Sequence, residues 1–182
     1  MNKFLKWTLI ILGGLVVLLF VAFKVLQSQT KKHSPEATVA FTNGDLSVNV
    51  FYNRPSVRGR VIFGELVPYG ETWRTGANEA TTFETNQDLT IQGKTLPAGK
   101  YTLWTVPGES EWQVVCNKEM YSWGVDFSAK ALRNPASDAL IVTVPVERRK
   151  NTEEMFTISF AEGSPNQMAL AWDDIRVKVP FE

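Results

Sequence analysis

The chain has 182 residues, 44% of them hydrophobic, which suits one packed domain with a short appendage. The formal net charge is zero, but all 19 acidic residues lie at or after Glu36, so residues 33–182 carry 14 basic and 19 acidic side chains. This acidic balance argues against nucleic acid as a partner, because phosphate binding needs clustered Lys and Arg. The single cysteine, Cys116, excludes an intrachain disulfide.

The first predicted element is an apolar segment at the N-terminus. Residues 7–23 contain no charge, and residues 24–26 extend the span to about 20 residues, the length that crosses a bilayer. We therefore assign residues 1–26 to a transmembrane anchor, or uncleaved signal, that contacts the membrane through residues 7–26. The alternative is a cleaved secretory signal, which has a shorter apolar stretch and a small-x-small cleavage site.

Either a signal or an anchor exports the chain that follows. The two lysines before the apolar segment favour a cytoplasmic N-terminus, whereas the three that follow it oppose this orientation under the positive-inside rule. We expect a single-pass membrane protein whose soluble domain lies on the outer, periplasmic or extracytoplasmic side. Residues 27–36 are mostly polar and are predicted to form a linker to a domain at residues 37–182.

The domain shows the period-two alternation of β-strands. Apolar and polar residues alternate over residues 46–52, 140–146, 156–160, 168–172 and 175–181. Turn signals separate the runs, at residues 43–45, 107–110 and 163–166. We predict an all-β fold: an antiparallel, jelly-roll-like β-sandwich of about 8–10 strands, with a barrel as the alternative.

The least regular stretch, residues 53–82, is rich in Arg, Gly, Pro and aromatic residues and is the candidate functional loop. Arg54 and Arg74 carry guanidinium groups that bind carboxylate or phosphate in a bidentate manner. Asn78 has an amide suited to a sugar hydroxyl, and Glu79 is a candidate general base. Each also has a commoner structural role: Arg74 pairs with a carboxylate such as Glu79, Asn78 caps a turn, and Glu79 stays solvated or paired.

Tryptophans form the second set of candidates, because exposed indole rings stack on sugars and peptides. Trp112 and Trp172 follow the apolar faces of predicted strands and belong to the core. Trp104 is out of phase with the apolar face of its strand, and Trp73 and Trp123 lie in loop-like segments. These three are the better candidates for exposed tryptophans, and each is a candidate for contact with a ligand.

The remaining composition restricts the chemistry of the domain. The only histidine, His33, lies in the predicted linker, which excludes His-dependent triads and His-ligated zinc from the domain. Cys116 shares a strand face with Trp112 and is expected to be a small buried core residue. The sequence has no glycine-rich phosphate loop and no familiar acidic calcium loop. We predict no cofactor and no metal, and any catalysis would depend on carboxylates.

Three runs of residues are distinctive: residues 53–60, residues 62–70 and the long run Trp-Arg-Thr-Gly-Ala-Asn-Glu-Ala-Thr at residues 73–81. With shorter pieces at residues 96–101, 107–108, 117–118 and 123–124, they resemble the bacterial domain-of-unknown-function 2911 (DUF2911) family over residues 36–181. The resemblance implies an exported β-rich domain behind a signal or anchor, and it implies no activity, cofactor or catalytic residue. The chain departs from the family pattern at Asn53, where serine is common, and at residues 125–127, where a small residue and a tyrosine are commoner.

Three functions are compatible with these observations. The first is a non-catalytic binding module of the cell envelope, which recognises a glycan, a peptide or an envelope protein through Arg54, Trp73, Arg74, Asn78 and Glu79. The second is a carboxylate-dependent hydrolase or isomerase, for example one acting on envelope glycans, that uses Glu79 with Glu65, Glu71 or Asp126. The third is a purely structural envelope protein, in which the motif only specifies the fold. The sequence favours the first.

Overall fold

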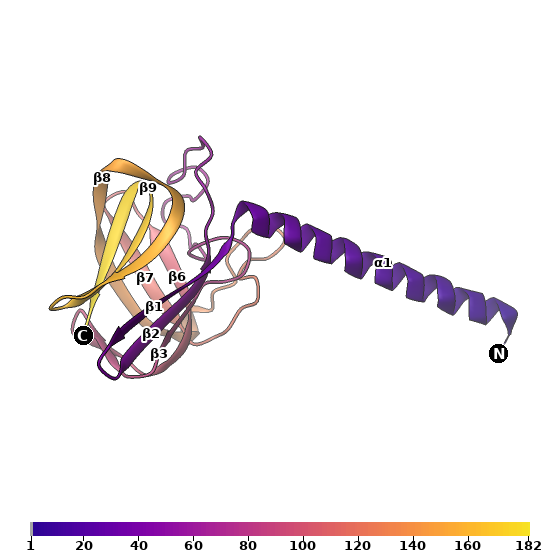
Figure 1. The fold of residues 1–182 in the computed structure, drawn as a ribbon, viewed down its shortest axis with the longest axis horizontal. Coiled ribbons are helices and arrows are strands. Elements are labelled where there is room, and N and C mark those ends of the chain that lie inside the picture. The colour runs from indigo at the N-terminus through magenta and orange to yellow at the C-terminus, as the bar shows by residue number, and fades with distance from the viewer. Residues whose placement is uncertain (1) are drawn as a thin grey trace. The chain divides into compact units, whose positions relative to one another are not determined.

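A computed structural model describes residues 2–182, without the side chains of Leu26 and Gln27. Met1 and the side chain of Leu26, both within the predicted anchor, lie outside the described residues. The chain divides into a helical unit that ends at His33 and a β domain, Ser34–Glu182. Figure 1 shows the N-terminal helix and the strands of the β domain.

The N-terminal unit is one helix, α1 (Lys3–His33). Its most apolar window of 18 residues has a mean hydropathy of 2.8, and none of that window is buried in the structure. By length and composition α1 is able to cross a membrane, as a secretory signal helix of similar composition also is.

The helix continues through residues 27–33, which we expected to belong to a polar linker. Gln and Lys are good helix formers, so the end of the apolar stretch does not end the helix. The helix stops before Pro35, whose ring disfavours helical dihedrals at the preceding residue, Ser34. Only Ser34 and Pro35 therefore separate α1 from the first strand, which begins at Glu36.

The described residues of the β domain form nine strands. They are β1 (Glu36–Asn43), β2 (Leu46–Asn53), β3 (Thr82–Thr85), β4 (Leu89–Ile91), β5 (Lys94–Leu96), β6 (Gly99–Pro107), β7 (Glu111–Asn117), β8 (Asp138–Ala161) and β9 (Asn166–Phe181), with a short 3₁₀ turn, η1 (Pro135–Ser137), before β8. Every strand pairing is antiparallel. This confirms the predicted all-β antiparallel fold preceded by one N-terminal helix.

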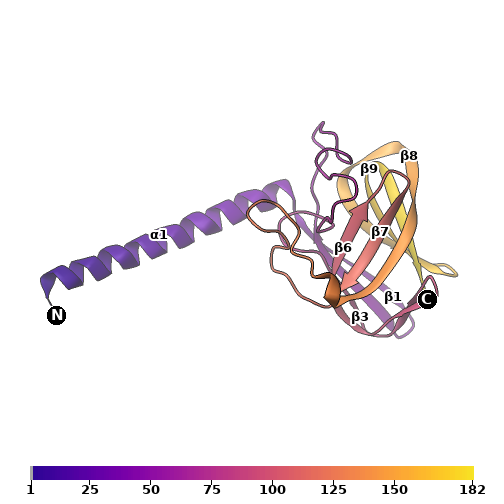
Figure 2. The same ribbon diagram turned by 180° about the vertical axis from the view of Figure 1, so that it is seen from behind.

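Seven strands form one curled sheet in the order β1-β2-β3-β6-β7-β8-β9, and β4 and β5 form a separate hairpin. The order follows the chain, so the described sheet is a meander without the crossing connections of a jelly roll. Views from two sides show the sheet wrapping around its own interior (Figures 1 and 2). The long strand β8 makes this possible: its first part pairs with β7, its second part pairs with β9, and the β9 pairing contains register shifts on both sides of Glu153. Such bulges bend a strand and increase its twist.

An irregular segment after β2 joins that side of the curled sheet to β8. Val57 N donates to Glu154 O at 2.8 Å, and Phe156 N donates to Pro55 O at 2.8 Å. Residues 55–57 thereby pair with the second half of β8. The curled sheet is closed along this line by backbone hydrogen bonds, so it leaves fewer unpaired strand edges.

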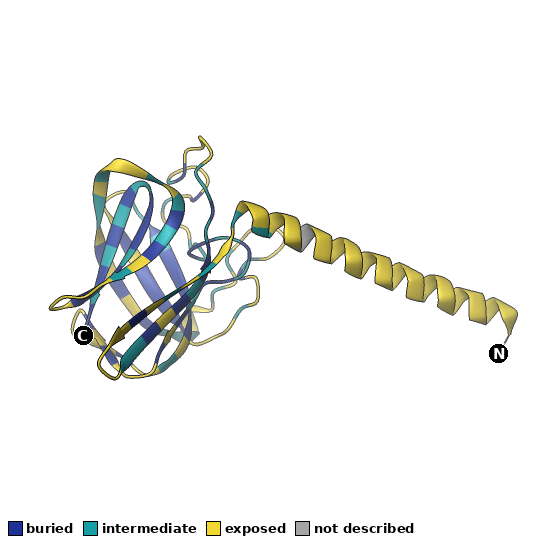
Figure 3. Ribbon diagram, viewed as in Figure 1, coloured by how far each residue is buried: buried dark blue, intermediate teal, exposed yellow. Residues whose placement is uncertain are grey.

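The hydrophobic core fills the interior of the curled sheet, and buried positions alternate with exposed ones along the strands (Figure 3). Trp112 and Trp172 are each 2% exposed, which confirms their predicted place in the core. Cys116 is also buried, as expected, and burial raises the pKa of its thiol to about 12. The thiol is therefore a packing group and not a reactive one.

Candidate functional site

Within the irregular stretch of residues 53–82, residues 73–81, hereafter the candidate loop, pack against β6. Trp73 and Thr105 exchange backbone hydrogen bonds of 2.7 and 3.0 Å. The hydroxyls of Thr75 and Thr105 lie 3.1 Å apart, and Thr81 Oγ1 donates to Thr75 O at 2.7 Å. Thr75 is fully buried with a φ of 56°, which is rare for a β-branched residue. These contacts hold the loop in one conformation.

Close approach of the backbone explains the glycine within this loop. Gly76 has a φ of 153°, and a Cβ added to it would lie 2.9 Å from Asn53 O and 3.2 Å from Thr81 Oγ1. Only glycine fits at this distance. The loop is therefore packed directly on the end of β2.

Arg74 joins the candidate loop to the segment around Trp123. Its Nη1 donates to Asn78 O at 2.9 Å and to Trp123 O at 3.1 Å, and its guanidinium carbon lies 5.7 Å from the centre of the Trp123 ring. Both hydrogen bonds come from Nη1, so Nε and Nη2 donate to none of the described residues. Burial lowers the pKa of Arg74, and the negative charge of Glu79 opposes that shift.

Asn78 and Glu79 have mainly structural contacts. Asn78 is 7% exposed, has a φ of 54°, and its Nδ2 donates to Ser34 O at 3.4 Å. It is thus the turn residue that the sequence also suggested, and it ties the loop to the start of the domain. Glu79 Oε2 accepts a hydrogen bond from Asn53 Nδ2 at 3.1 Å.

Trp73 is half-buried at the rim of the core instead of exposed as we expected. Its ring stacks on Trp172 at 5.7 Å and 15° and packs edge-on against Phe156 at 5.1 Å. Its Nε1 donates to Gly76 O at 3.0 Å. The candidate loop folds back over the end of the core, so the Trp73 ring packs against the core aromatic rings and is largely removed from water.

Arg54 is turned towards β8 and away from the other candidates. Its Nε donates to Phe156 O at 3.2 Å and its Nη2 to Thr157 Oγ1 at 2.8 Å. Its backbone N donates to Pro35 O at 2.9 Å. The Arg54 side chain therefore stabilises the contact between the segment after β2 and β8.

Trp104, which we expected to be exposed, is completely buried. The phase of β6 does place its ring outside the main core, but residues 118–134 cover that outer face. The Tyr121 ring packs on it at 5.3 Å and 76°, and a Cβ on Gly124 would lie 3.2 Å from the Trp104 ring. Nothing in the local alternation of β6 reveals that a later loop covers this face.

Residues 118–134, hereafter the 118–134 loop, are held by a polar cluster that the sequence analysis missed. The Glu119 carboxylate accepts hydrogen bonds from Tyr121 Oη at 2.7 Å, Asn134 Nδ2 at 2.6 Å and Ser137 Oγ at 2.6 Å. These bonds, led by that of Ser137, lower the pKa of Glu119. The Asn134-Pro135 dipeptide, a turn signal, was the one local clue to this cluster.

The structure therefore brings together Arg74, Asn78, Glu79 and Trp123. Trp123 is 37% exposed, in agreement with its predicted exposure. The surface consists of a fixed guanidinium with two uncommitted nitrogens beside a partly open indole face. Such a pair can bind a carboxylate, a phosphate or a hydroxyl and stack on a ring or chain.

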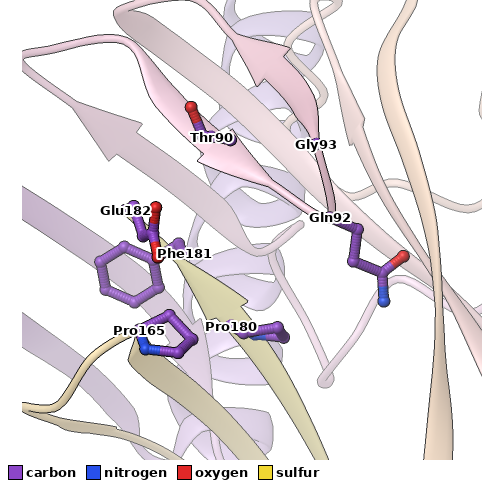
Figure 4. Close-up of a pocket in the computed structure, with 7 residues that line it drawn as sticks. All are labelled: Thr90, Gln92, Gly93, Pro165, Pro180, Phe181 and Glu182. Atoms are coloured by element: carbon purple, nitrogen blue, oxygen red, sulfur yellow. The ribbon is translucent and has the colours of Figure 1, made fainter.

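A shallow hollow of about 220 Å³ lies elsewhere, where β4 meets the end of β9 (Figure 4). It is lined by Thr90, Gln92, Gly93, Pro165, Pro180, Phe181 and Glu182. None of the candidate residues lines it, and Glu182 is its one charged side chain. Its polar groups do not converge on a common point in Figure 4, so we assign it no chemistry.

Comparison with known proteins agrees with the resemblance noted in the sequence. No curated protein and no solved structure matches the chain. One family model, described as a protein of unknown function (DUF2911), matches residues 34–181, which is almost the whole β domain. The chain therefore belongs to the DUF2911 family.

Proposed function

We propose that this chain is a single-pass membrane protein whose β domain lies on the extracytoplasmic side of the cell envelope and binds a partner without catalysis. The length and apolar composition of α1 support the anchor. The lysines before its apolar segment support export of the β domain. The partner is a glycan, a peptide or an envelope protein.

One observation supports binding at the Arg74–Trp123 surface. Arg74 is fixed by two hydrogen bonds from Nη1, which leaves Nε and Nη2 for a partner, and the Trp123 ring beside it is partly open. A preorganised guanidinium loses little side-chain entropy on binding. Glu79 is held by Asn53 as a hydrogen-bond acceptor, which suits a fixed structural carboxylate better than a general base.

The anchor and its orientation can be tested with the full-length chain in a bacterial host. We expect the chain to stay in the membrane fraction after an alkaline wash. In spheroplasts, protease added from outside should degrade the β domain. Release of a shortened chain into the soluble fraction would show a cleaved signal, and a protected β domain would show the opposite orientation.

The binding surface can be tested by melting residues 34–182 with peptidoglycan fragments, glycans and peptides. A ligand present at about 100 times its Kd stabilises the fold by roughly 2.7 kcal/mol, so a shift of several degrees is expected. Trp123→Ala should abolish the shift. Ile141→Ala is the matched control, because Ile141 is an equally exposed apolar residue on β8. Equal shifts in both variants would remove Trp123 from the binding surface.

A further inference from the structure

Most of the large apolar side chains that remain exposed on the β domain gather in one loop. Among the described residues outside α1 these are Val61, Leu66, Met120, Trp123, Phe127, Leu132 and Ile141. Four of them belong to the 118–134 loop, in which Phe127 is fully exposed and Met120 and Leu132 are each 49% exposed. Single exposed apolar residues are ordinary, but a group of this kind marks an interaction surface.

The tip of this loop is rigidly built. Asp126 N donates to Lys130 O at 2.9 Å. The Asp126 carboxylate accepts hydrogen bonds from Ser128 N at 2.8 Å and from Lys130 N at 3.0 Å. These bonds form a tight turn that holds Phe127 at its tip. A polar residue would satisfy the same turn, so the turn itself does not require an aromatic side chain there.

The loop is tied to the residue at which the chain enters the domain. Trp123 O accepts a hydrogen bond from Arg74 Nη1, and the same nitrogen donates to Asn78 O. Asn78 Nδ2 in turn donates to Ser34 O. Ser34 directly follows the last residue of α1. Three hydrogen bonds thus connect the exposed apolar loop to Ser34, the first residue of the β domain.

The chain between the apolar segment and the domain is short. Residues 27–33 are helical, and seven helical residues rise about 10 Å. The polar layer on each side of a bilayer is roughly 5–8 Å thick. If residues 7–26 span the hydrocarbon, eight residue steps separate its edge from Ser34, so Ser34 lies no more than about 12 Å from that edge, whatever the tilt of the helix. The loop beside Ser34 is therefore within reach of the lipid headgroups.

The composition of the loop fits that environment. Trp, Phe, Met and Leu side chains with nearby lysines are typical of protein segments that lie in the membrane interface. Lys118 and Lys130 are both exposed in this loop. Their ammonium groups can reach lipid phosphates while the apolar side chains enter the upper acyl region.

We infer that the 118–134 loop rests in the lipid interface of the membrane that holds α1, with Phe127 as its deepest side chain. The inference rests on the proposed anchor and names lipid as the partner of this part of the domain. It also places the Arg74–Trp123 surface at the level of the headgroups.

The test places a spin label at single positions of the full-length chain in nanodiscs of phosphatidylethanolamine and phosphatidylglycerol. Cys116 is buried and the pKa of its thiol is about 12, so an introduced cysteine is labelled selectively at neutral pH. The variants are Phe127→Cys, Thr95→Cys on the exposed face of β5, and Leu18→Cys in the middle of α1. Power saturation compares the access of oxygen, which enriches in lipid, with that of a nickel chelate, which stays in water.

The label at position 127 should be more accessible to oxygen than to the chelate, and the label at position 95 should show the reverse. A label at position 18 in lipid and a label at position 127 in water would overturn the inference and leave the anchor standing, with the loop facing a soluble partner. A label at position 18 in water would overturn the anchor itself, and the inference with it.

Discussion

At the scale of single residues, Arg74 performs a structural and a potential binding role at once. Its Nη1 donates hydrogen bonds to the carbonyl oxygens of Asn78 and Trp123. Arg74→Ala removes this donor from one partly buried acceptor, Asn78 O, and one exposed acceptor, Trp123 O, and also removes the contact with the Trp123 ring. Hydrogen bonds from charged groups contribute about 1.5–3 kcal/mol, so we expect the free energy of unfolding to fall by about 2–3 kcal/mol in urea titrations of residues 34–182.

Arg148→Ala is the matched control for that measurement. Arg148 forms an ion pair with Asp174 at 2.8 Å, but its side chain is 62% exposed, so its loss should cost less than about 1 kcal/mol. Arg74→Lys should lie between the two, because an ammonium can reach a carbonyl but cannot stack as a planar group. Equal losses for Arg74→Ala and Arg148→Ala would contradict a bracing role for Arg74.

The sequence predicts which residues belong to the candidate site better than it predicts how far each side chain is buried. The run at residues 73–81 drew attention in the sequence, and the structure does bring Arg74, Asn78 and Glu79 together. The prediction that Trp73 and Trp104 are exposed was wrong, because segments distant in sequence cover both side chains. Alternation within a strand reports which face a side chain is on, but not whether a later loop shields that face.

At the scale of elements, closure of the curled sheet depends on a contact between β2 and β8. The hydroxyl of Tyr52 accepts a hydrogen bond from Ile158 N at 3.0 Å and lies 3.4 Å from Ile158 O. Tyr52→Phe leaves this buried amide without its partner, at a cost of about 1–3 kcal/mol. Hydrogen exchange of the Ile158 amide should become correspondingly faster.

Tyr69→Phe serves as the control for this change. Tyr69 is only half-buried, and its hydroxyl forms no hydrogen bond with the described residues. Its substitution should leave exchange at Ile158 unchanged. If Tyr52→Phe also leaves it unchanged, the closure depends on the backbone pairing of residues 55–57 alone.

The 118–134 loop should respond to pH through Glu119. Hydrogen bonds hold the pKa of this carboxyl below its usual value in the folded protein. Its contribution to stability is therefore complete above the unfolded pKa of about 4.3 and is lost as the pH falls through the lower folded pKa. Glu119→Gln should be less stable than the parent at pH 7, and the gap should shrink as the pH falls below 4. A gap that stays constant over this range would show that the ionised form has no special role.

The elements themselves were largely predictable, while their connections were not. Alternation and turn signals gave the strands and the hairpins at residues 43–45, 107–110 and 163–166. The sequence does not predict the continuation of α1 to His33, because the loss of hydrophobicity after residue 26 does not by itself mark the end of a helix. The meander and the bend in β8 depend on long-range pairing and bulges, which local patterns do not encode.

At the scale of the whole molecule, the β domain has the features of an independent folding unit. Every residue of the main core lies between Phe41 and Phe181, and the family match ends at similar limits, residues 34 and 181. Residues 34–182 should therefore fold without α1. If α1 anchors the chain as we propose, tethering gives the domain a high effective concentration at the membrane, typically millimolar for a short linker. The 118–134 loop would then need only weak intrinsic affinity for lipid.

This reasoning predicts how the isolated domain behaves with vesicles of phosphatidylethanolamine and phosphatidylglycerol. Residues 34–182 should sediment with them only at high lipid concentration. Complete burial of a Phe side chain contributes about 1.5–3 kcal/mol, so Phe127→Ser should weaken the partitioning by about tenfold or more. Ile141→Ser removes an exposed apolar residue outside the loop and should have little effect. Equal weakening in the two variants would mean that general surface hydrophobicity, and not the tip of the 118–134 loop, determines contact with lipid.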